Sequence, residues 1–178
     1  GRTGYKYDIK IYPAKRLFLY FKNNTLDFII PSQSQIKRFK DIAVFSDKPI
    51  LNLQLRAYSY SKDTRLPENQ NALNGKRVTL IRGYSYFGLL DYINDPSNRI
   101  EKRIVNNHES GLLQLVANRT DLFLDYSLPA EYVIKNFGKH EFKHSNLFSQ
   151  NIYFAISKEY PDCEIVLNRI IREYEDNF

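Results

Sequence analysis

Residues 77–93 read RVTLIRGYSYFGLLDYI, and this stretch decides the class of fold. Its first five residues, Arg77-Val78-Thr79-Leu80-Ile81, predict a strand, since three of them are apolar and three are β-branched. Gly83 and the polar residues after it predict a turn, and residues 87–93 then carry the apolar spacing of a short helix. A strand followed by a turn and a helix is the repeating unit of α/β proteins, in which helices cover mainly parallel sheets.

The same alternation continues on both sides of this stretch. Further strands are expected at residues 26–30, 50–60, 104–105, 122–124 and 152–156. Further helices are expected at residues 109–117, at 130–135 and after Cys163, where apolar residues recur at helical spacing. Residues 5–11 alternate like a strand, and Pro13 begins a helix. Two such blocks joined by strand-like segments predict two lobes, and small-molecule sites prefer the space between lobes.

The composition argues against several classes of protein. The 178 residues are 43% hydrophobic and 26% charged, which is ordinary for a globular protein. No apolar run reaches the roughly 18–20 residues of a membrane span, and the first residues do not read as a signal peptide. The net charge of +6 comes from scattered basic pairs and not from a stripe, which argues against nucleic-acid binding. Cys163 is the single cysteine, so no internal disulfide is possible.

Seven short motifs follow one another along the chain. They are Lys15-Arg16 with Asn24-Thr25-Leu26-Asp27-Phe28-Ile29-Ile30; Ser32-Gln33-Ser34 with Arg38; Phe45-Ser46-Asp47; Asn74-Gly75-Lys76-Arg77-Val78; Arg82-Gly83-Tyr84-Ser85; Leu112 to Asp121 with Asp125; and Tyr153-Phe154-Ala155-Ile156-Ser157-Lys158. Their order and spacing resemble those of extracellular solute-binding protein family 3. The well-known members of that family are the polar amino-acid binding proteins of bacterial ABC importers.

The resemblance implies an α/β, two-lobed periplasmic-binding-protein-like fold of type II. Residues 1–52 and 158–178 would build lobe 1, and residues 53–157 would build lobe 2. The family begins with a strand and a loop before its first helix, so we expect the opening strand unit of lobe 1 and the signal segment to be absent from this chain. The implied protein is a monomeric, extracytoplasmic or periplasmic receptor without cofactor or metal. It would capture a small polar, amino-acid-like solute for the membrane permease of an ABC importer and catalyse no reaction.

Seven residues are the candidate solute contacts that the resemblance implies. They are Ser32, Ser34 and Arg38 in lobe 1, and Tyr84, Ser85, Tyr86 and Asp125 in lobe 2. Arg38 would pair with a carboxylate through its planar fork, and Asp125 would take an ammonium, because buried charges require partners. Gly83 would let the backbone approach the solute closely.

Each candidate contact also has a plainer interpretation. Arg38 stands near Lys37 and Lys40 and fits a solvated helix face. The serines fit turn positions, and the tyrosines fit packing against their own lobe. Asp125 fits the N-cap of the helix that follows it.

Other functions remain open at this stage. His140-Glu141-Phe142-Lys143-His144 matches the H-E-x-x-H motif of zinc proteases, with Glu164 as a conceivable third ligand. Its polar flanks and Lys143 favour a polar surface loop without zinc. A ligand-sensing module of a signalling protein and an enzyme such as a dehydratase are further alternatives on the same fold.

Overall fold

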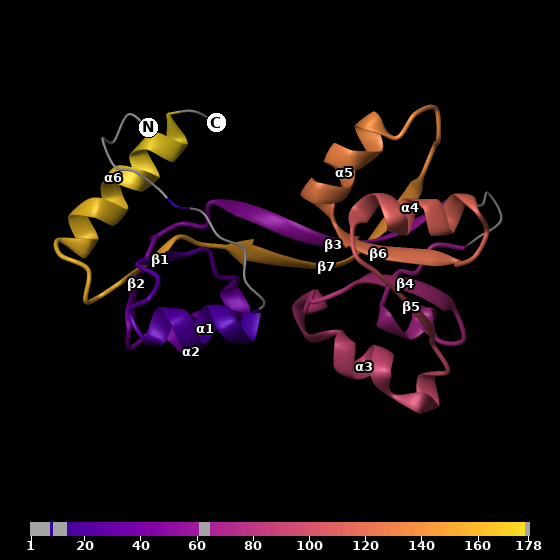
Figure 1. Ribbon diagram of the computed structural model, residues 1–178, viewed down its shortest axis with the longest axis horizontal. Coiled ribbons are helices and arrows are strands. Elements are labelled where there is room, and N and C mark those ends of the chain that lie inside the picture. Colours follow the sequence, from indigo (N-terminus) through magenta and orange to yellow (C-terminus); the bar gives the residue numbers. More distant parts are fainter. Residues whose placement is uncertain (1–7, 9–13, 61–64, 177–178) are drawn as a thin grey trace. The chain divides into compact units, whose positions relative to one another are not determined.

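The computed structural model describes residue 8, residues 14–60 and residues 65–176. It divides into two compact units, drawn in Figure 1: unit 1 is Gly1–Asn52 with Gln150–Phe178, and unit 2 is Leu53–Ser149. The expected lobe 2 extends to residue 157, whereas residues 150–157 belong to unit 1, because strand β8 (Ala155–Ser157) pairs with two strands of that unit. Of the strand expected at residues 5–11, only Asp8 is among the described residues, and Pro13 is not.

Unit 1 is a small antiparallel sheet between helices. Its strands, in the order β1-β8-β2, are β1 (Phe28–Ile29), β8 and β2 (Ala43–Phe45). Its helices are α1 (Ala14–Lys22), the 3-10 turn η1 (Gln33–Gln35), α2 (Ile36–Phe39) and α6 (Cys163–Glu175). Mainly parallel pairing is therefore wrong for this unit, since β8 runs antiparallel to both neighbours.

Side chains alternate across the sheet of unit 1 because successive residues of a strand point to opposite faces. Ala155 packs with Phe21 and Phe39, whose helices cover one face. Ile156 packs with Val166 and other apolar residues of α6 on the opposite face. The amphipathic closing helix predicted from the sequence is therefore the cover of this second face.

Unit 2 contains a five-stranded mixed sheet in the order β5-β4-β6-β3-β7. Its strands are β3 (Leu51–Ser59), β4 (Arg77–Ile81), β5 (Glu101–Val105), β6 (Leu122–Tyr126) and β7 (Lys143–Ile152). Its α-helices are α3 (Leu90–Asn94), α4 (His108–Val116) and α5 (Ser127–Asn136), and its 3-10 turns are η2 (Gln70–Leu73), η3 (Tyr86–Gly88) and η4 (Pro96–Asn98). β4 runs parallel to β5 and β6, whereas β3 is antiparallel to β6.

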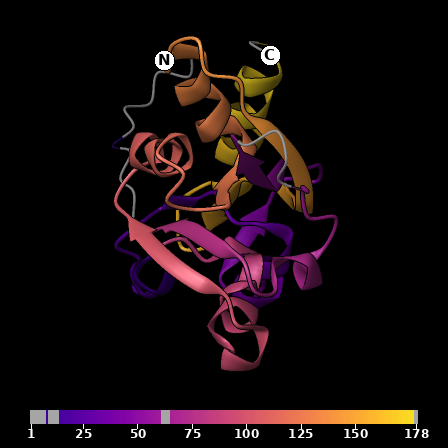
Figure 2. The same cartoon turned by 90° about the vertical axis from the view of Figure 1, so that its right-hand side faces the viewer.

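The helices of unit 2 cover both faces of its sheet. α4 and α5 lie on one side and α3 on the other in Figure 1, and Figure 2 shows the same arrangement after a quarter turn. The side chains of β6 point alternately to these two sides. Leu122 and Leu124 pack in a cluster that includes Ile93 of α3. Phe123 packs with Leu112 and Leu115 of α4. Most residues of β4 and β6 are thus buried, because helices cover both faces of these strands.

Helix α4 packs directly on β6. Gly111 is buried there, and a Cβ atom on this residue would lie 2.3 Å from ring atoms of Phe123. This close approach sets the first turn of α4 against the end of β6. His108 and Asp125 therefore meet.

A polar loop was expected around residues 140–144, but strand β7 begins at Lys143. The expectation of a loop is therefore wrong from Lys143 onward. Most residues of β7 are polar or exposed, but its side chains are held: Arg56 Nε donates to Asn146 Oδ1 at 2.9 Å, and Ser145 Oγ donates to the Pro67 carbonyl at 2.6 Å. The strand expected at residues 152–156 is interrupted, because β7 ends at Ile152 and β8 begins at Ala155. No helix among the described residues is long and apolar enough to cross a membrane.

Candidate functional site

In unit 1, Ser32 and Ser34 form a small hydroxyl cluster at the end of β1. Their Oγ atoms lie 3.0 Å apart, and Ser34 Oγ donates to Gln150 Oε1 at 2.8 Å. The Ser32 backbone N–H donates to Gln35 Oε1 at 3.0 Å, which fixes the turn into η1. Ser32 is buried, whereas Ser34 is exposed. The structure therefore brings these two candidate contacts together, with Gln150 as a third polar group.

Arg38 lies on α2 with its guanidinium exposed. Its Cζ atom stands 3.8 Å from the centroid of the Phe18 ring, a cation–π distance. None of the described carboxylates pairs with it. The aromatic face supports the guanidinium without using its N–H donors, so these remain available to an anion.

In unit 2, the turn after β4 carries three candidate contacts. Gly83 has φ +85°, a conformation that favours glycine, and Tyr86 and Phe87 also lie in the left-handed region at φ 50° and 54°. The Tyr86 hydroxyl secures this turn, since it accepts from the Ile81 N–H and donates to the Ile81 carbonyl at 3.3 Å. Tyr86 is buried, and burial raises the pKa of its hydroxyl.

Tyr84 and Ser85 are more accessible than Tyr86. The Tyr84 ring lies 5.3 Å from the Tyr126 ring, centroid to centroid, and burial raises the pKa of both hydroxyls. Ser85 is exposed, and its hydroxyl acts to lower the pKa of Tyr126 against the larger effect of burial. The turn thus presents a phenol and a hydroxyl, while Tyr86 is part of the core.

Asp125 is the most buried charged group of the seven candidate contacts, with 0% exposure. Its Oδ2 lies 2.6 Å from His108 Nδ1, and its Oδ1 accepts from the Tyr126 N–H at 2.8 Å. Burial raises the pKa of this carboxyl from 3.8 to about 6, although the hydrogen bond and charge of His108 act to lower it. Asp125 precedes α5 without capping it in the usual way, since Tyr126 holds the N-cap position.

Sequence reasoning missed His108, Tyr126 and Gln150. A capping signal for His108 was available: the Asn107 side chain accepts from the Ser110 N–H, so α4 begins one residue before the expected helix. Its contact with Asp125 is tertiary, and no sequence pattern could have found it. The same holds for Gln150, which is 116 residues from Ser34.

The H-E-x-x-H motif is not helical. His140 precedes β7 and His144 lies within it, whereas a zinc protease needs both imidazoles on one face of a helix. His140 Nδ1 lies 3.2 Å from the Tyr60 hydroxyl, and the His144 ring lies 5.6 Å from the Tyr58 ring. Within residues 14–60 and 65–176, no group of three or more metal-ligating side chains is placed to hold an ion.

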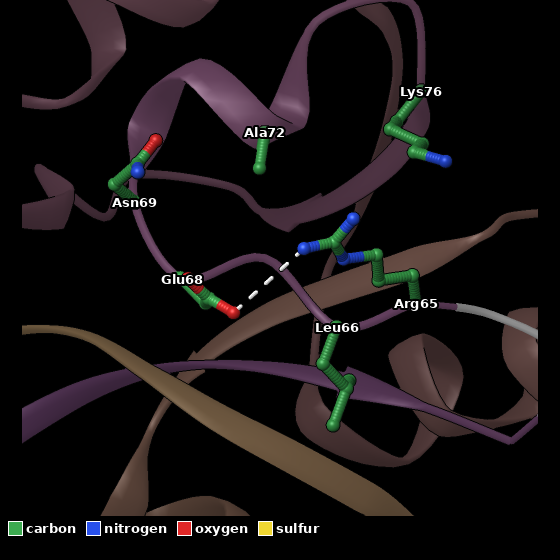
Figure 3. A pocket seen from close by; sticks show the side chains of 6 residues that line it. All are labelled: Arg65, Leu66, Glu68, Asn69, Ala72 and Lys76. Atoms are coloured by element: carbon green, nitrogen blue, oxygen red, sulfur yellow. Dashed lines mark ion pairs between the residues drawn. The ribbon is translucent and has the colours of Figure 1, made fainter.

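A shallow pocket of about 280 Å³ lies elsewhere in unit 2. Its lining, drawn in Figure 3, is Arg65, Leu66, Glu68, Asn69, Ala72 and Lys76. The Arg65 guanidinium is directed toward Glu68 at 3.9 Å, and both side chains are exposed. None of the seven candidate contacts lines this pocket.

No family model matches the chain, and no curated protein matches it either. Solved structures match it along almost its whole length. A mutant of ArgBP from T. maritima has a TM-score of 0.69 at 18% identity, covering 99% of this chain and 75% of that chain. The substrate binding protein of an amino acid ABC transporter has a TM-score of 0.65 at 16% identity, and the match covers 99% of this chain and 77% of that chain. The GluR0 ligand binding core in complex with L-glutamate has a TM-score of 0.66 at 13% identity, and the match covers 95% of this chain and 79% of that chain. These matches show that the chain has the two-lobed α/β fold of the periplasmic binding proteins.

Proposed function

We propose that this protein is an extracytoplasmic receptor that captures a small polar solute for ABC-type import and catalyses no reaction. It acts as a monomer and delivers the solute to a membrane permease. The observation that carries the proposal is the fold, which the chain shares over 95–99% of its length with binding proteins, one of them from an amino acid ABC transporter.

The polar groups of each unit support this role. Unit 1 offers the exposed Arg38 guanidinium and, separately, the paired hydroxyls of Ser32 and Ser34. A guanidinium with free N–H donors suits a carboxylate, because its fork makes two parallel hydrogen bonds. Unit 2 offers Tyr84, Ser85 and the Asp125–His108 pair. Such sets of few polar groups on a rigid scaffold are typical of sites for small solutes.

A thermal-shift screen tests the proposal directly. The full chain would be melted with each of the common amino acids and with their organic-acid counterparts. A solute that binds only the folded state stabilises it by roughly 2.7 kcal/mol at a hundredfold excess over Kd. We expect at least one solute to raise Tm, and the Arg38→Ala variant to lose most of that rise. A screen in which no solute raises Tm would contradict the proposal.

A sensing module is the second candidate function. The match to the GluR0 ligand binding core favours it, since that structure is a ligand binding core in complex with L-glutamate. The full gene decides between the two: a membrane-spanning segment encoded after residue 178 would assign this chain to a larger receptor. A gene that ends near this residue, beside genes for a permease, would assign it to transport.

A further inference from the structure

The Asp125 carboxylate is covered by a side chain of its own unit. Both of its oxygens have partners, and the side chain has no exposed surface. The His108 side chain, which forms one of these hydrogen bonds, is 24% exposed. A solute that approaches this part of unit 2 therefore meets the imidazole before it meets the carboxylate.

The hydrogen bond to Asp125 fixes which nitrogen of the ring carries a proton. Burial raises the pKa of Asp125 to about 6, so this carboxylate is ionised at pH 8 and can only accept hydrogen bonds. His108 Nδ1 lies 2.6 Å from Oδ2 and must then be the donor. In the neutral ring, the other nitrogen, Nε2, keeps a lone pair and is an acceptor.

The negative charge of Asp125 is available to a cation of the solute. Arg56 stands opposite Asp125 in the register of β3 and β6, but its guanidinium pairs with Glu131. Among the described residues, no lysine or arginine forms an ion pair with Asp125. With a neutral His108, the pair therefore has a net negative charge, and a buried charge without a counter-charge is costly. A cation that binds at Nε2 would offset this cost.

The Tyr84 hydroxyl stands where such a cation would bind. It lies 3.4 Å from His108 Nε2, at the long end of the range for a hydrogen bond, so the two atoms hold each other weakly. Burial raises the pKa of this hydroxyl, and the charge of Asp125 raises it further, so the negative potential of the carboxylate extends to this point. An ammonium group can donate to both Nε2 and the phenol oxygen, whereas a carboxylate would meet a lone pair and a negative potential.

We propose that His108 is the residue of unit 2 that contacts the solute, and that its Nε2 lone pair accepts a hydrogen bond from an ammonium group. Asp125 is then a positioning residue: it fixes the tautomer of the ring and supplies the negative charge behind it. The site selects amino acids over the same acids without the ammonium. The inference rests on the proposed function and names both the contact and the class of solute.

Pairs of solutes that differ only in the α-ammonium test this selection. The probes are L-glutamate with glutarate, L-glutamine with glutaramate and L-arginine with 5-guanidinopentanoate, titrated by calorimetry into the full chain at pH 8. We expect the member with the ammonium to bind about tenfold more tightly, which corresponds to about 1.4 kcal/mol. His108→Phe keeps a ring over Asp125 but removes both nitrogens, so it should bring the two members to similar affinity.

Asp125→Asn is the sharper variant, because it should reverse the tautomer of His108. The Tyr126 N–H donates to Oδ1, so the amide oxygen of an asparagine takes that place and its NH2 group faces His108 Nδ1. Nδ1 must then accept, and the proton of the neutral ring moves to Nε2. We expect this variant to bind the amino acids about tenfold more weakly and the members without the ammonium at least as tightly as the natural protein does.

Nitrogen-15 NMR of labelled histidine measures the tautomer independently of affinity. In the natural protein with the amino acid bound at pH 8, His108 should have a protonated Nδ1 and an unprotonated Nε2. Asp125→Asn should show the reverse, and the spectrum of His108→Phe identifies the signals. Asp121→Asn is the matched control, since it removes a carboxylate that stands before β6 and pairs with Arg77. It should change neither the tautomer nor the preference.

Three results would overturn the inference and leave the receptor function intact. The first is tighter binding of the members without the ammonium by the natural protein. The second is a protonated Nε2 in its complex with an amino acid. The third is a preference for the ammonium that persists unchanged in both Asp125→Asn and His108→Phe. Absence of binding for every member of every pair would instead contradict the receptor function itself, and the inference with it.

Discussion

His108 Nδ1 lies 2.6 Å from Asp125 Oδ2, although the two residues are 17 positions apart and belong to different elements. The helix start and the strand end that carry them are brought together by the contact of Gly111 with Phe123. The buried carboxylate of Asp125 thus contacts an ionisable side chain because α4 packs closely on β6.

The charge of Asp125 should make stability depend on pH. Burial raises its pKa from 3.8 to about 6, so the folded state holds the proton more tightly than the unfolded chain. Its contribution to stability is present below about pH 4 and is lost as the pH rises to about 6. We expect the natural protein to lose up to about 3 kcal/mol relative to Asp125→Asn over this interval. Urea unfolding of both proteins across this pH range measures the difference, and a constant difference would contradict the assignment.

Asp121 should show the opposite dependence. Burial acts to raise its pKa, but the hydrogen bonds and charge of Arg77 outweigh burial and lower it. Arg77 Nη2 donates to Asp121 Oδ1 at 2.7 Å, and the Arg77 N–H donates to Oδ2 at 2.8 Å. This pair stabilises the fold above about pH 4 and is lost as the pH falls. Asp121→Asn should therefore be destabilising at neutral pH and nearly neutral in acid, as urea unfolding at the two pH values would show.

Gly111→Ala should destabilise unit 2 by about 1–3 kcal/mol, the range for overpacking a core. Alanine is the better helix former, but its Cβ would stand 2.3 Å from ring atoms of Phe123. Thermal unfolding measures the loss. A second substitution, Phe123→Leu, makes room for the methyl group, so the double variant should lose less than the two single losses added together. An unchanged Tm for Gly111→Ala would mean that α4 can move away from β6.

Two buried threonines of unit 2 should respond differently to valine. Thr79 Oγ1 has no hydrogen-bond partner among the described residues, whereas the single proton of Thr120 Oγ1 has two carbonyl acceptors within reach, Arg77 at 2.9 Å and Leu122 at 3.0 Å. Replacing a buried hydroxyl without a partner is nearly neutral or stabilising, while replacing a bonded one costs about 1 kcal/mol. Chemical denaturation should give a higher free energy of unfolding for Thr79→Val than for Thr120→Val. The reverse order would indicate that a bound water serves Thr79.

Arg38→Ala should weaken solute binding at least about thirtyfold, since removal of one member of a charged pair costs about 2–5 kcal/mol. Arg38→Lys should restore little, because an ammonium lacks the planar fork. The stability of the solute-free protein should change little, since the side chain is exposed and stacks on Phe18. Calorimetry with the solute found by the thermal-shift screen measures the affinities. Equal affinity of the natural and Arg38→Ala proteins would remove Arg38 from the site.

Local patterns predicted the elements whose side chains alternate or cluster strongly. The strand at residues 77–81 was predicted with its observed bounds, and the helix expected at 109–117 differs from α4 by one residue at each end. Strand β7 escaped prediction because most of its residues are polar, so that its apolar residues do not form a clear strand pattern. The antiparallel pairing of β8 escaped as well, since Ile156 pairs with Phe28 from the far end of the chain.

The candidate contacts came from a resemblance in motif order, and the sequence could place them only on elements. It could not show that the Tyr86 hydroxyl is hydrogen-bonded within its own turn or that Asp125 is buried against His108. Nor could it show that Ser34 is hydrogen-bonded to Gln150. Each of these facts depends on a neighbour distant in sequence. The chemistry of single residues is thus predictable at this level, whereas their accessibility is not.

The order of strands in unit 1 has a consequence for synthesis. The middle strand, β8, comes from residues 155–157, while its two neighbours come from residues 28–45. A growing chain therefore contains all of unit 2 before β1 and β2 have any partner. Unit 2 should mature first on the ribosome, because domains generally fold as units during synthesis. During that interval the unpaired edges of β1 and β2 are the part of the molecule most open to wrong association or to a chaperone.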